Sequence, residues 1–436
     1  MGRIRMDRRL TIRMNGRFVG TWQFGRESRF IYSKLWLESP WARPISLSMP
    51  ITGTDAVYTG PVVDAFFDNL LPDSETIRRR LQSRFGTRTT GAFDLLSEIG
   101  RDCVGALQFF PEGDEPTEVK TIRSVPLSEK DMASALRHQT TDSAFGISDT
   151  SGGFRISLAG AQEKTAFLFH DGRWHRPLES TPTTHIFKRP LGRIGLEGID
   201  LSTSLENEWL CLRILSGFDI PAAPSRLETF EDEKALIVER FDRQLARDRS
   251  WWIRLPQEDF CQVTGTSPGL KYQSDGGPGI RDIAGILNGS VFAEDDKKIF
   301  FKSQIVFWLM AASDGHAKNF SIFLLPEGRF RMTPLYDVIS AYPVLGKGSG
   351  LKMAMAVRGS RGNRYEWDRI SGRHWISTAR DAGLSKATVE EILSDVVDAV
   401  PDVVNEAGSN LLPGFPESVS GPILEGVERN MRRLEL

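Results

Sequence analysis

Cysteine is scarce in this chain, with three residues (Cys103, Cys211 and Cys261) among 436. They lie far apart and show neither the spacing of a zinc site nor the density of a disulfide-rich secreted domain. We therefore interpret them as reduced, buried thiols of a cytoplasmic protein. With 40% apolar and 26% charged residues, the chain is long enough for two or three domains with ordinary hydrophobic cores.

Long apolar runs and an excess of one charge are also lacking. No run reaches the roughly 20 residues of a membrane span, and the N-terminus has no apolar signal-peptide core. Because 55 basic residues face 57 acidic ones, net charge does not predict a nucleic-acid binder. Locally, residues 1–13 carry five arginines and residues 358–380 carry six, which predicts either solvated faces or phosphate-contacting patches.

The His-Arg-Asp and Asp-Phe-Gly triplets of ordinary protein kinases are absent; 312–314 (ASD) and 336–338 (YDV) stand in their place. The polar spacing is nevertheless that of a kinase site, because Asn319 follows Asp314 by five residues and Asp337 comes eighteen later. In kinases the first Asp takes the proton of the acceptor hydroxyl, and the Asn and second Asp bind Mg²⁺. We therefore predict Asp314 as the base, with Asn319 and Asp337 as magnesium ligands.

The surroundings of this motif fit a catalytic loop. Residues 303–312 are apolar enough for a buried helix, and the polar run begins where that helix would end. His316 and Lys318 flank the base, where they either contact phosphate or cap the helix end. Asp and Asn are also common in turns without any catalytic role, so the prediction depends on the rest of the chain.

Other parts of a nucleotide site occur in kinase order. The small-residue turn 157–165 separates two predicted strands and suits a phosphate-cradling loop, although it is not a complete Walker A sequence. Lys188 ends a predicted strand, and Glu208 in the following predicted helix is its preferred ion-pair partner, with Glu206 second. The 238–242 segment (VERFD) is either a hinge offering backbone groups and an apolar wall to adenine, or a plain strand end.

The pattern of elements predicts an α+β, two-lobed protein-kinase-like fold. A hairpin at 9–24 turns at Asn15-Gly16, and two helical stretches follow at 62–84 and 93–99. Strand signals dominate residues 154–240 around a helix at about 202–216. From 256 onward helices prevail, with strands expected only around 319–337. We assign residues 1–120 to an added N-terminal β/α subdomain, 121–241 to a β-rich N-lobe and 242–436 to a mostly helical C-lobe.

Seven segments resemble the HipA toxin kinases, and the resemblance runs from about residue 10 to past residue 400. Only the basic segment after 358 and the C-terminal tail match loosely. The matching blocks are 66–73 (FFDNLLPD), 95–105 (LLSEIGRDCVG), 157–165 (SLAGAQEKT), 254–259 (RLPQED), 271–279 (KYQSDGGPG), 314–319 (DGHAKN) and 336–337 (YD).

The resemblance implies a Ser/Thr kinase of a bacterial type II toxin–antitoxin system that uses ATP and Mg²⁺. It implies that Asp314 is the base, that Asn319 and Asp337 bind the metal, and that Ser157 is an autophosphorylation site. The implied ATP-binding residues are Ala159, Gly160, Ala161, Gln162, Glu163, Lys164, Lys188, Glu239, Arg240, Phe241, His316, Ala317, Lys318, Asn319, Tyr336 and Asp337.

The resemblance also implies partners. Family members phosphorylate an aminoacyl-tRNA synthetase, and a small helix-turn-helix antitoxin, HipB, holds the kinase on operator DNA. The position aligned with a DNA-contacting basic residue is Arg380, but a second such position holds Gly383. Two alternatives stay open: a catalytically idle, DNA-bound co-repressor, and a kinase for a small molecule or lipid.

Overall fold

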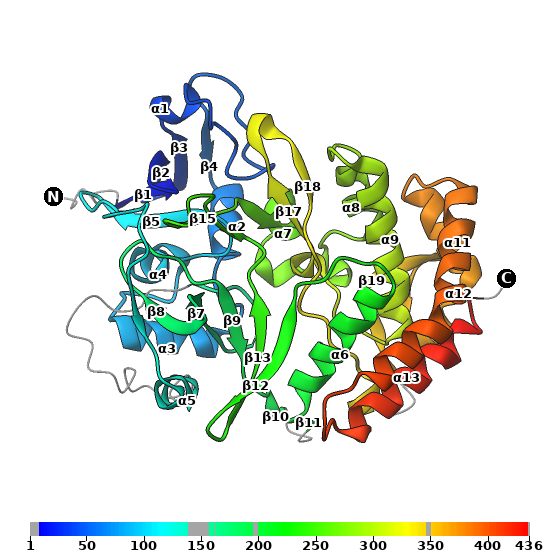
Figure 1. Ribbon diagram of the computed structural model, residues 1–436. Helices are drawn as coiled ribbons and strands as arrows, with labels where there is room; N and C mark the ends of the chain where they lie inside the picture. The colour runs from blue at the N-terminus through cyan, green and yellow to red at the C-terminus, as the bar shows by residue number, and fades with distance from the viewer. Residues whose placement is uncertain (1–7, 138–156, 161, 195–198, 346–349, 435–436) are drawn as a thin grey trace. The chain divides into compact units, whose positions relative to one another are not determined.

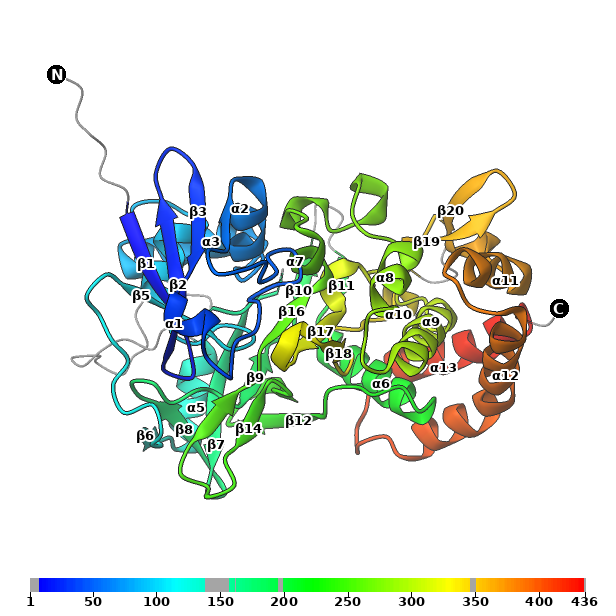
Figure 2. The same ribbon diagram turned by 90° about the horizontal axis from the view of Figure 1, so that it is seen from above.

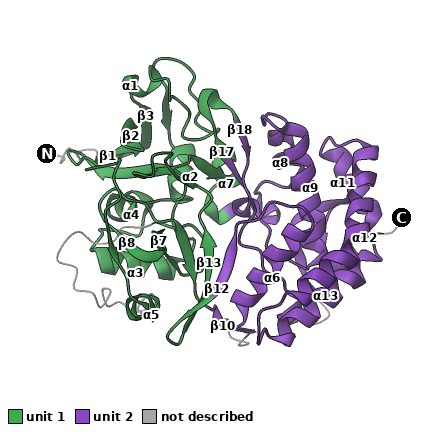
Figure 3. Ribbon diagram, in the orientation of Figure 1, with its two compact units in different colours: residues 1–189, 228–269, 323–329 green, residues 190–227, 270–322, 330–436 purple. Residues whose placement is uncertain are grey.

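The computed structural model describes residues 8–137, 157–160, 162–194, 199–345 and 350–434. The chain folds into two compact units (Figure 3). Unit 1 contains residues 1–189, 228–269 and 323–329; unit 2 contains residues 190–227, 270–322 and 330–436. Each unit is therefore assembled from segments that are distant in the sequence. In the part of the chain that the structure describes, no helix has both the length and the apolar character of a bilayer span.

The first sheet of unit 1 is antiparallel, in the order β4-β3-β2-β1-β5 (Figure 2). The predicted hairpin at its centre is confirmed: Asn15 and Gly16 connect β1 to β2 with φ angles of 48° and 82°. Both residue types tolerate this left-handed conformation, which a two-residue hairpin turn requires. The strands are β1 (Arg8–Met14), β2 (Arg17–Phe24), β3 (Ser28–Tyr32), β4 (Val57–Thr59) and β5 (Leu107–Pro111).

Helices α2 (Pro61–Asp68) and α4 (Ala92–Ile99) pack against this sheet. Trp22 of β2 stacks on Phe67 with ring centroids 4.1 Å apart and meets Phe93 edge-on at 5.0 Å. Such aromatic contacts add to the stabilisation from apolar burial. The helical prediction for 62–84, interrupted at Pro72, is confirmed by α2 and α3 (Glu75–Phe85), and α4 confirms the shorter helix.

The second sheet of unit 1 has the order β12-β13-β9-β7-β8-β6 (Figure 1). Buried residues of helix α5 (Glu129–Arg137), including Met132 and Leu136, share a core with Phe167, Phe187 and Ile237 of its strands. The strands are β6 (Ser124–Pro126), β7 (Lys164–His170), β8 (Arg173–Pro177), β9 (His185–Lys188), β12 (Ser225–Phe230) and β13 (Glu233–Glu239).

Unit 2 is mainly helical, and α9 (Ala293–Leu309) packs against three neighbouring helices (Figure 1). Its C-terminal half is wholly buried, as the apolar run in the sequence predicts. The principal helices of unit 2 are α6 (Ser204–Gly217), α8 (Ile280–Leu287), α9, α11 (Gly372–Asp381), α12 (Lys386–Ser409) and α13 (Glu417–Met431).

One expectation for the C-terminal half is wrong. Beyond residue 340 the chain forms a further antiparallel hairpin of β19 (Lys352–Gly359) and β20 (Gly362–Glu366), beside α11 (Figure 2). Short elements complete the two units: α1 (Lys34–Leu37), β10 (Gly192–Ile194), β11 (Ile199–Leu201), β14 (Arg243–Leu245), β15 (Trp252–Arg254), β16 (Gln257–Asp259), α7 (Phe260–Thr264), β17 (Ser321–Leu324), β18 (Phe330–Met332) and α10 (Tyr342–Leu345).

Candidate active site

The loop that carries Asp314 begins directly at the end of α9. The helix is closed by Ala311, whose φ of 51° is left-handed, and the amide of Ala312 donates to the carbonyl of Phe307 at 2.8 Å. This is the arrangement of a Schellman helix end. A side chain at Gly315 would lie 2.6 Å from the Phe307 ring, so the loop can pass this closely over the core only with glycine there. The base is thus placed at a rigid helix end.

Two side chains join this loop to the 336–337 segment. The Tyr336 hydroxyl donates to the carbonyl of Lys318 at 2.9 Å, and the Asn319 amide Nδ2 donates to the carbonyl of Asp337 at 3.2 Å. Asn319 Oδ1 also accepts from the amide of His316 at 3.3 Å. The structure therefore brings Asp314, Asn319 and Asp337, the three residues of the predicted spacing, onto two loops of unit 2 that are bonded to each other.

Asp337 has a φ of 61°, a left-handed conformation that is uncommon outside glycine. Such a backbone costs on the order of 1 kcal/mol or more and is found where a side chain must be held in a specific direction. Asp337 is half-buried, and Asn319 is buried. A carboxylate and an amide oxygen are the hard donors that suit Mg²⁺ when phosphate oxygens and water supply the remaining ligands. The donor set present therefore fits the metal.

His316 is the third polar group of this site, with 6% of its surface exposed. Burial lowers the pKa of His316 to about 4, with nearby Lys271 adding to the effect and Asp314 and Asp337 opposing it. The ring is therefore neutral at physiological pH. Within the described part of the chain its Nδ1 atom is buried without a hydrogen-bond partner. Such an orphaned atom is costly unless a ligand satisfies it, which fits a bound nucleotide.

Tyr272 is a contact of the base that the sequence did not indicate. Its hydroxyl donates to Oδ1 of Asp314 at 2.6 Å, and its ring meets the His316 ring edge-on with centroids 5.2 Å apart. The residue comes 42 positions before Asp314, in the glycine-rich 271–279 segment. No local pattern in the sequence signals a contact over this separation.

Unit 1 carries the predicted phosphate-binding lysines on neighbouring strands. Lys164 of β7 lies directly opposite Lys188 of β9, and Lys188 is buried with 4% of its surface exposed. Like charges in directly opposite positions destabilise a sheet unless another group compensates them. A polyphosphate is an anion that would suit this pair.

The predicted phosphate loop is anchored at its start and its end. The Gly160 carbonyl accepts from the amide of Asp73 at 3.0 Å, and Gln162 donates to the carbonyl of Arg189 at 2.7 Å. The Glu163 carboxylate pairs with Arg80 of α3. Ala159 and Lys164 lie in the described part of the loop, whereas Ala161 lies outside the described residues.

Ser157 is fully buried. Its hydroxyl donates to the carbonyl of Leu70 at 2.7 Å, and its amide donates to the carbonyl of Asp102 at 3.2 Å. In this conformation the hydroxyl is engaged inside unit 1 rather than presented to a nucleotide. A phosphate on Ser157 would be incompatible with this position, because a dianion cannot donate to a carbonyl and is costly to bury.

The predicted hinge residues divide into two kinds. Phe241 meets Phe323 edge-on at 5.8 Å and provides an apolar wall, and Glu239 is exposed. Arg240, in contrast, directs its polar atoms inward: its amide donates to the carbonyl of Thr184, and its guanidinium pairs with Asp102 and Asp242. The polar groups of Arg240 are thus used within unit 1.

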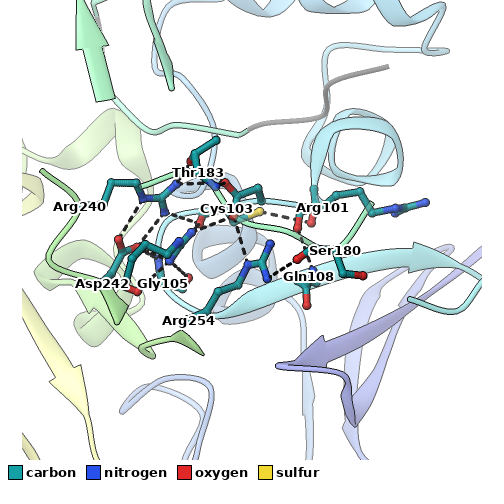
Figure 4. A network of polar contacts seen from close by, with 12 residues as sticks. Arg101, Cys103, Gly105, Gln108, Ser180, Thr183, Arg240, Asp242 and Arg254 are labelled. Atoms are coloured by element: carbon teal, nitrogen blue, oxygen red, sulfur yellow. Dashed lines mark hydrogen bonds and ion pairs between the residues drawn. The ribbon is translucent and has the colours of Figure 1, made fainter. Parts of the chain in front are cut away.

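Arg240 is part of a buried network that the sequence did not predict (Figure 4). Asp102 accepts from Arg243 at 2.9 Å and from Arg254 at 3.2 Å, and its second oxygen faces Arg240 at 3.3 Å. Asp242 pairs with Arg240 and Arg243 and also accepts from the amide of Gly105 at 2.7 Å. Burial opposes ionisation of Asp102, but the three arginines hold its pKa well below its usual value. The network ties the first 110 residues to the second sheet.

The remaining predicted positions are distributed as follows. Ala317 and Lys318 are buried in the loop after Asp314, and Arg380 is exposed in the last turn of α11. Lys188 belongs to unit 1 and Glu208 to unit 2, and their pairing stays a prediction. Of the N-terminal arginines, Arg8, Arg9 and Arg13 form ion pairs with acidic residues of unit 1, so they form a structural face.

Comparison with known proteins identifies the class. The HipA-like C-terminal domain matches residues 156–404, and the HipA N-terminal domain matches residues 10–110. The solved complex of Shewanella oneidensis MR-1 HipA with HipB and its operator DNA has the same fold, with a TM-score of 0.77 at 21% identity, covering 98% of this chain and 96% of that one. The predicted α+β class is confirmed.

The sequence relatives place the chain in a family. It is 32% identical over 404 residues to Y4mE of Sinorhizobium fredii, a protein named as a kinase, covering 91% of this chain and 90% of the relative. It is 29% identical over 322 residues to the serine/threonine-protein kinase toxin HipA of Shewanella oneidensis, covering 71% and 69%. The chain belongs to the HipA family.

Proposed function

We propose that this chain is an ATP- and Mg²⁺-dependent serine/threonine protein kinase that acts as the toxin of a type II toxin–antitoxin pair. The observation that carries the proposal is the set formed by Asp314, Asn319 and Asp337 on two loops bonded by Asn319 and Tyr336. The kinase and toxin names of its relatives support it.

In this proposal each polar group has one task. The Asp314 carboxylate accepts the proton of the acceptor hydroxyl as it attacks the γ-phosphorus. Asn319 and Asp337 hold the metal, which when bound neutralises charge on the phosphates. Neutral His316 offers Nδ1 to the nucleotide, while Lys164 and Lys188 on unit 1 contact its phosphates, with Phe241 and Glu239 beside the adenine.

The partners in the proposal follow the family. A small helix-turn-helix protein of the HipB kind would neutralise the kinase and hold it on operator DNA, as the printed description of the Shewanella complex supports. The protein substrate would be an aminoacyl-tRNA synthetase, and Ser157 would be the site of self-modification. Arg380, exposed on α11, is the proposed DNA contact.

The test is transfer of labelled γ-phosphate to the protein and to a cell extract, with wild type beside Asp314→Asn and Asp337→Asn. Asparagine at 337 also tolerates the left-handed backbone, so this variant removes charge without changing the loop. We expect a loss of transfer of about 100-fold or more in both variants. Equal transfer in wild type and Asp314→Asn would contradict the assignment of the base.

The same assay separates the alternatives. Label on protein supports the protein kinase, and label on a small metabolite would instead indicate a small-molecule kinase. ATP binding by calorimetry without any transfer would favour the idle co-repressor. Mapping the label by mass spectrometry tests Ser157 directly.

A further inference from the structure

The glycine-rich 271–279 segment folds into a tight turn on unit 2. The amides of Asp275 and Gly277 both donate to the carbonyl of Tyr272 at 3.0 Å. Gly276 has a φ of 102°, and a side chain at Gly277 would lie 2.2 Å from the carbonyl oxygen of Leu270. These positions therefore require glycine, and the segment has one compact backbone path.

Neighbouring elements hold the turn on both sides. The side-chain oxygen of Gln273 accepts from the amide of Ala356 in β19 at 2.7 Å. On the opposite side the Lys271 carbonyl faces the amide of Ala317 in the catalytic loop at 3.4 Å, a long hydrogen bond. Tyr272 lies between these two anchors, so its backbone is fixed relative to Asp314.

The Tyr272 side chain is directed at the base. Its hydroxyl donates to Asp314 Oδ1 at 2.6 Å, which is the short distance of a hydrogen bond to a charged acceptor. Its ring rests edge-on against His316 with an interplanar angle of 80°. With Oδ1 engaged, the carboxylate presents Oδ2 to an incoming hydroxyl, and its rotation is restricted.

We propose that Tyr272 is a positioning residue for the base: its hydroxyl fixes the Asp314 carboxylate in the orientation that accepts the proton of the substrate hydroxyl. The inference rests on the proposed function and extends it to the 271–279 segment, which has no other role in the mechanism. The rigid turn gives the segment its purpose, because a base misplaced by about 1 Å can cost a factor of about 100 in rate.

The test compares Tyr272→Phe with wild type in the labelled-ATP assay. Phenylalanine keeps the ring contact with His316 and removes only the donor. We expect kcat to fall by about 10- to 100-fold while KM for ATP and the thermal midpoint stay unchanged. Incorporation of 4-aminophenylalanine at position 272 restores an N–H donor, and we expect it to recover most of the lost kcat.

Tyr365→Phe provides the matched control, since Tyr365 is a half-buried tyrosine of β20 in the same unit and is not directed at the base. We expect it to behave as wild type. A double variant with Asp314→Asn should lose nothing beyond Asp314→Asn alone, because Tyr272 acts through that carboxylate.

Three results would overturn the inference. Wild-type kcat in Tyr272→Phe would show that the hydroxyl has no positioning role. Failure of 4-aminophenylalanine to restore kcat would assign the loss to packing. Phosphate mapped to Tyr272 would make it an acceptor. In each case Asp314→Asn remains inactive if the proposed function holds, so the two failures are distinguishable.

Discussion

Among single residues, Asp102 has the most demanding environment described here. It is buried with three arginines around it, and Asp242 supplies the second negative charge of the network. Buried ion pairs contribute little net stability when complete, but removing one partner leaves an uncompensated charge in the interior. The network is therefore sensitive to the loss of either carboxylate.

We expect Asp102→Asn to lower the free energy of unfolding by about 3–5 kcal/mol, measured by urea unfolding. Asp114→Asn is the matched control, because Asp114 is exposed and lies 3.6 Å from Arg101. Exposed pairs contribute only about 0–1 kcal/mol. Similar losses in both variants would contradict the buried network as the cause.

Glu258 of β16 provides a prediction of pH dependence. Its side chain is fully buried, with Leu47 donating to Oε1 at 2.8 Å and Ser46 in contact with Oε2. Burial raises the pKa of Glu258 from 4.5 to about 8, although both hydrogen bonds oppose the shift. The folded protein therefore binds a proton that the unfolded chain releases between these two pH values.

It follows that the contribution of Glu258 to stability is complete below about pH 4.5 and is lost as the pH rises to about 8. We expect Glu258→Gln to flatten this decline, by at most about 1.4 kcal/mol per pH unit, in urea unfolding at pH 5, 7 and 9. Glu112→Gln changes an exposed carboxylate of the same unit and should leave the pH profile unaltered. Parallel profiles for wild type and Glu258→Gln would refute the assignment.

At the level of elements, the phosphate loop has a buried serine next to it. We expect phosphorylation of Ser157 to expel residues 157–160 from their place beside Leu70 and to weaken ATP binding by at least tenfold, because the added charge also repels nucleotide phosphates. Calorimetry of the phosphorylated and unmodified forms measures the affinity. Ser157→Ala keeps the site apolar and serves as the control; equal ATP affinity of the two forms would rule the mechanism out.

Elements whose signals are local were predictable from the sequence. The hairpin at Asn15-Gly16 and the buried end of α9 follow from turn chemistry and apolar runs. The β19–β20 hairpin was missed because its connection, Ser360-Arg361, is no standard turn signal and its arginines suggested a charged surface.

The site shows the same division. The spacing of Asp314, Asn319 and Asp337 indicated the loops that the structure brings together. Tyr272 and the arginine network depend on contacts across 42 to 152 residues, which no local pattern encodes. Charged residues are also predicted to be exposed by default, so the burial of Arg240 could not be anticipated.

For the whole molecule, arginine placement bears on nucleic-acid binding. Five of the six arginines of 358–380 are exposed around β19, β20 and α11, which are bonded where the amide of Arg358 donates to Thr378 at 2.7 Å. We expect replacing Arg373 and Arg380 by Ala to make the salt dependence of operator binding by the antitoxin complex less steep by about one unit per lost phosphate contact. Arg193→Ala, at an exposed position of β10, is the control. An unaltered slope would remove this surface from the DNA interface.

The arginine network also has a consequence for synthesis on the ribosome. Asp102 leaves the ribosome 152 residues before Arg254. At roughly 5–20 residues per second this interval lasts about 8–30 s. During that time the first sheet has a carboxylate that folding would bury without its cations. A nascent chain truncated in this interval is therefore unable to complete its N-terminal part and is exposed to the proteases of the cell.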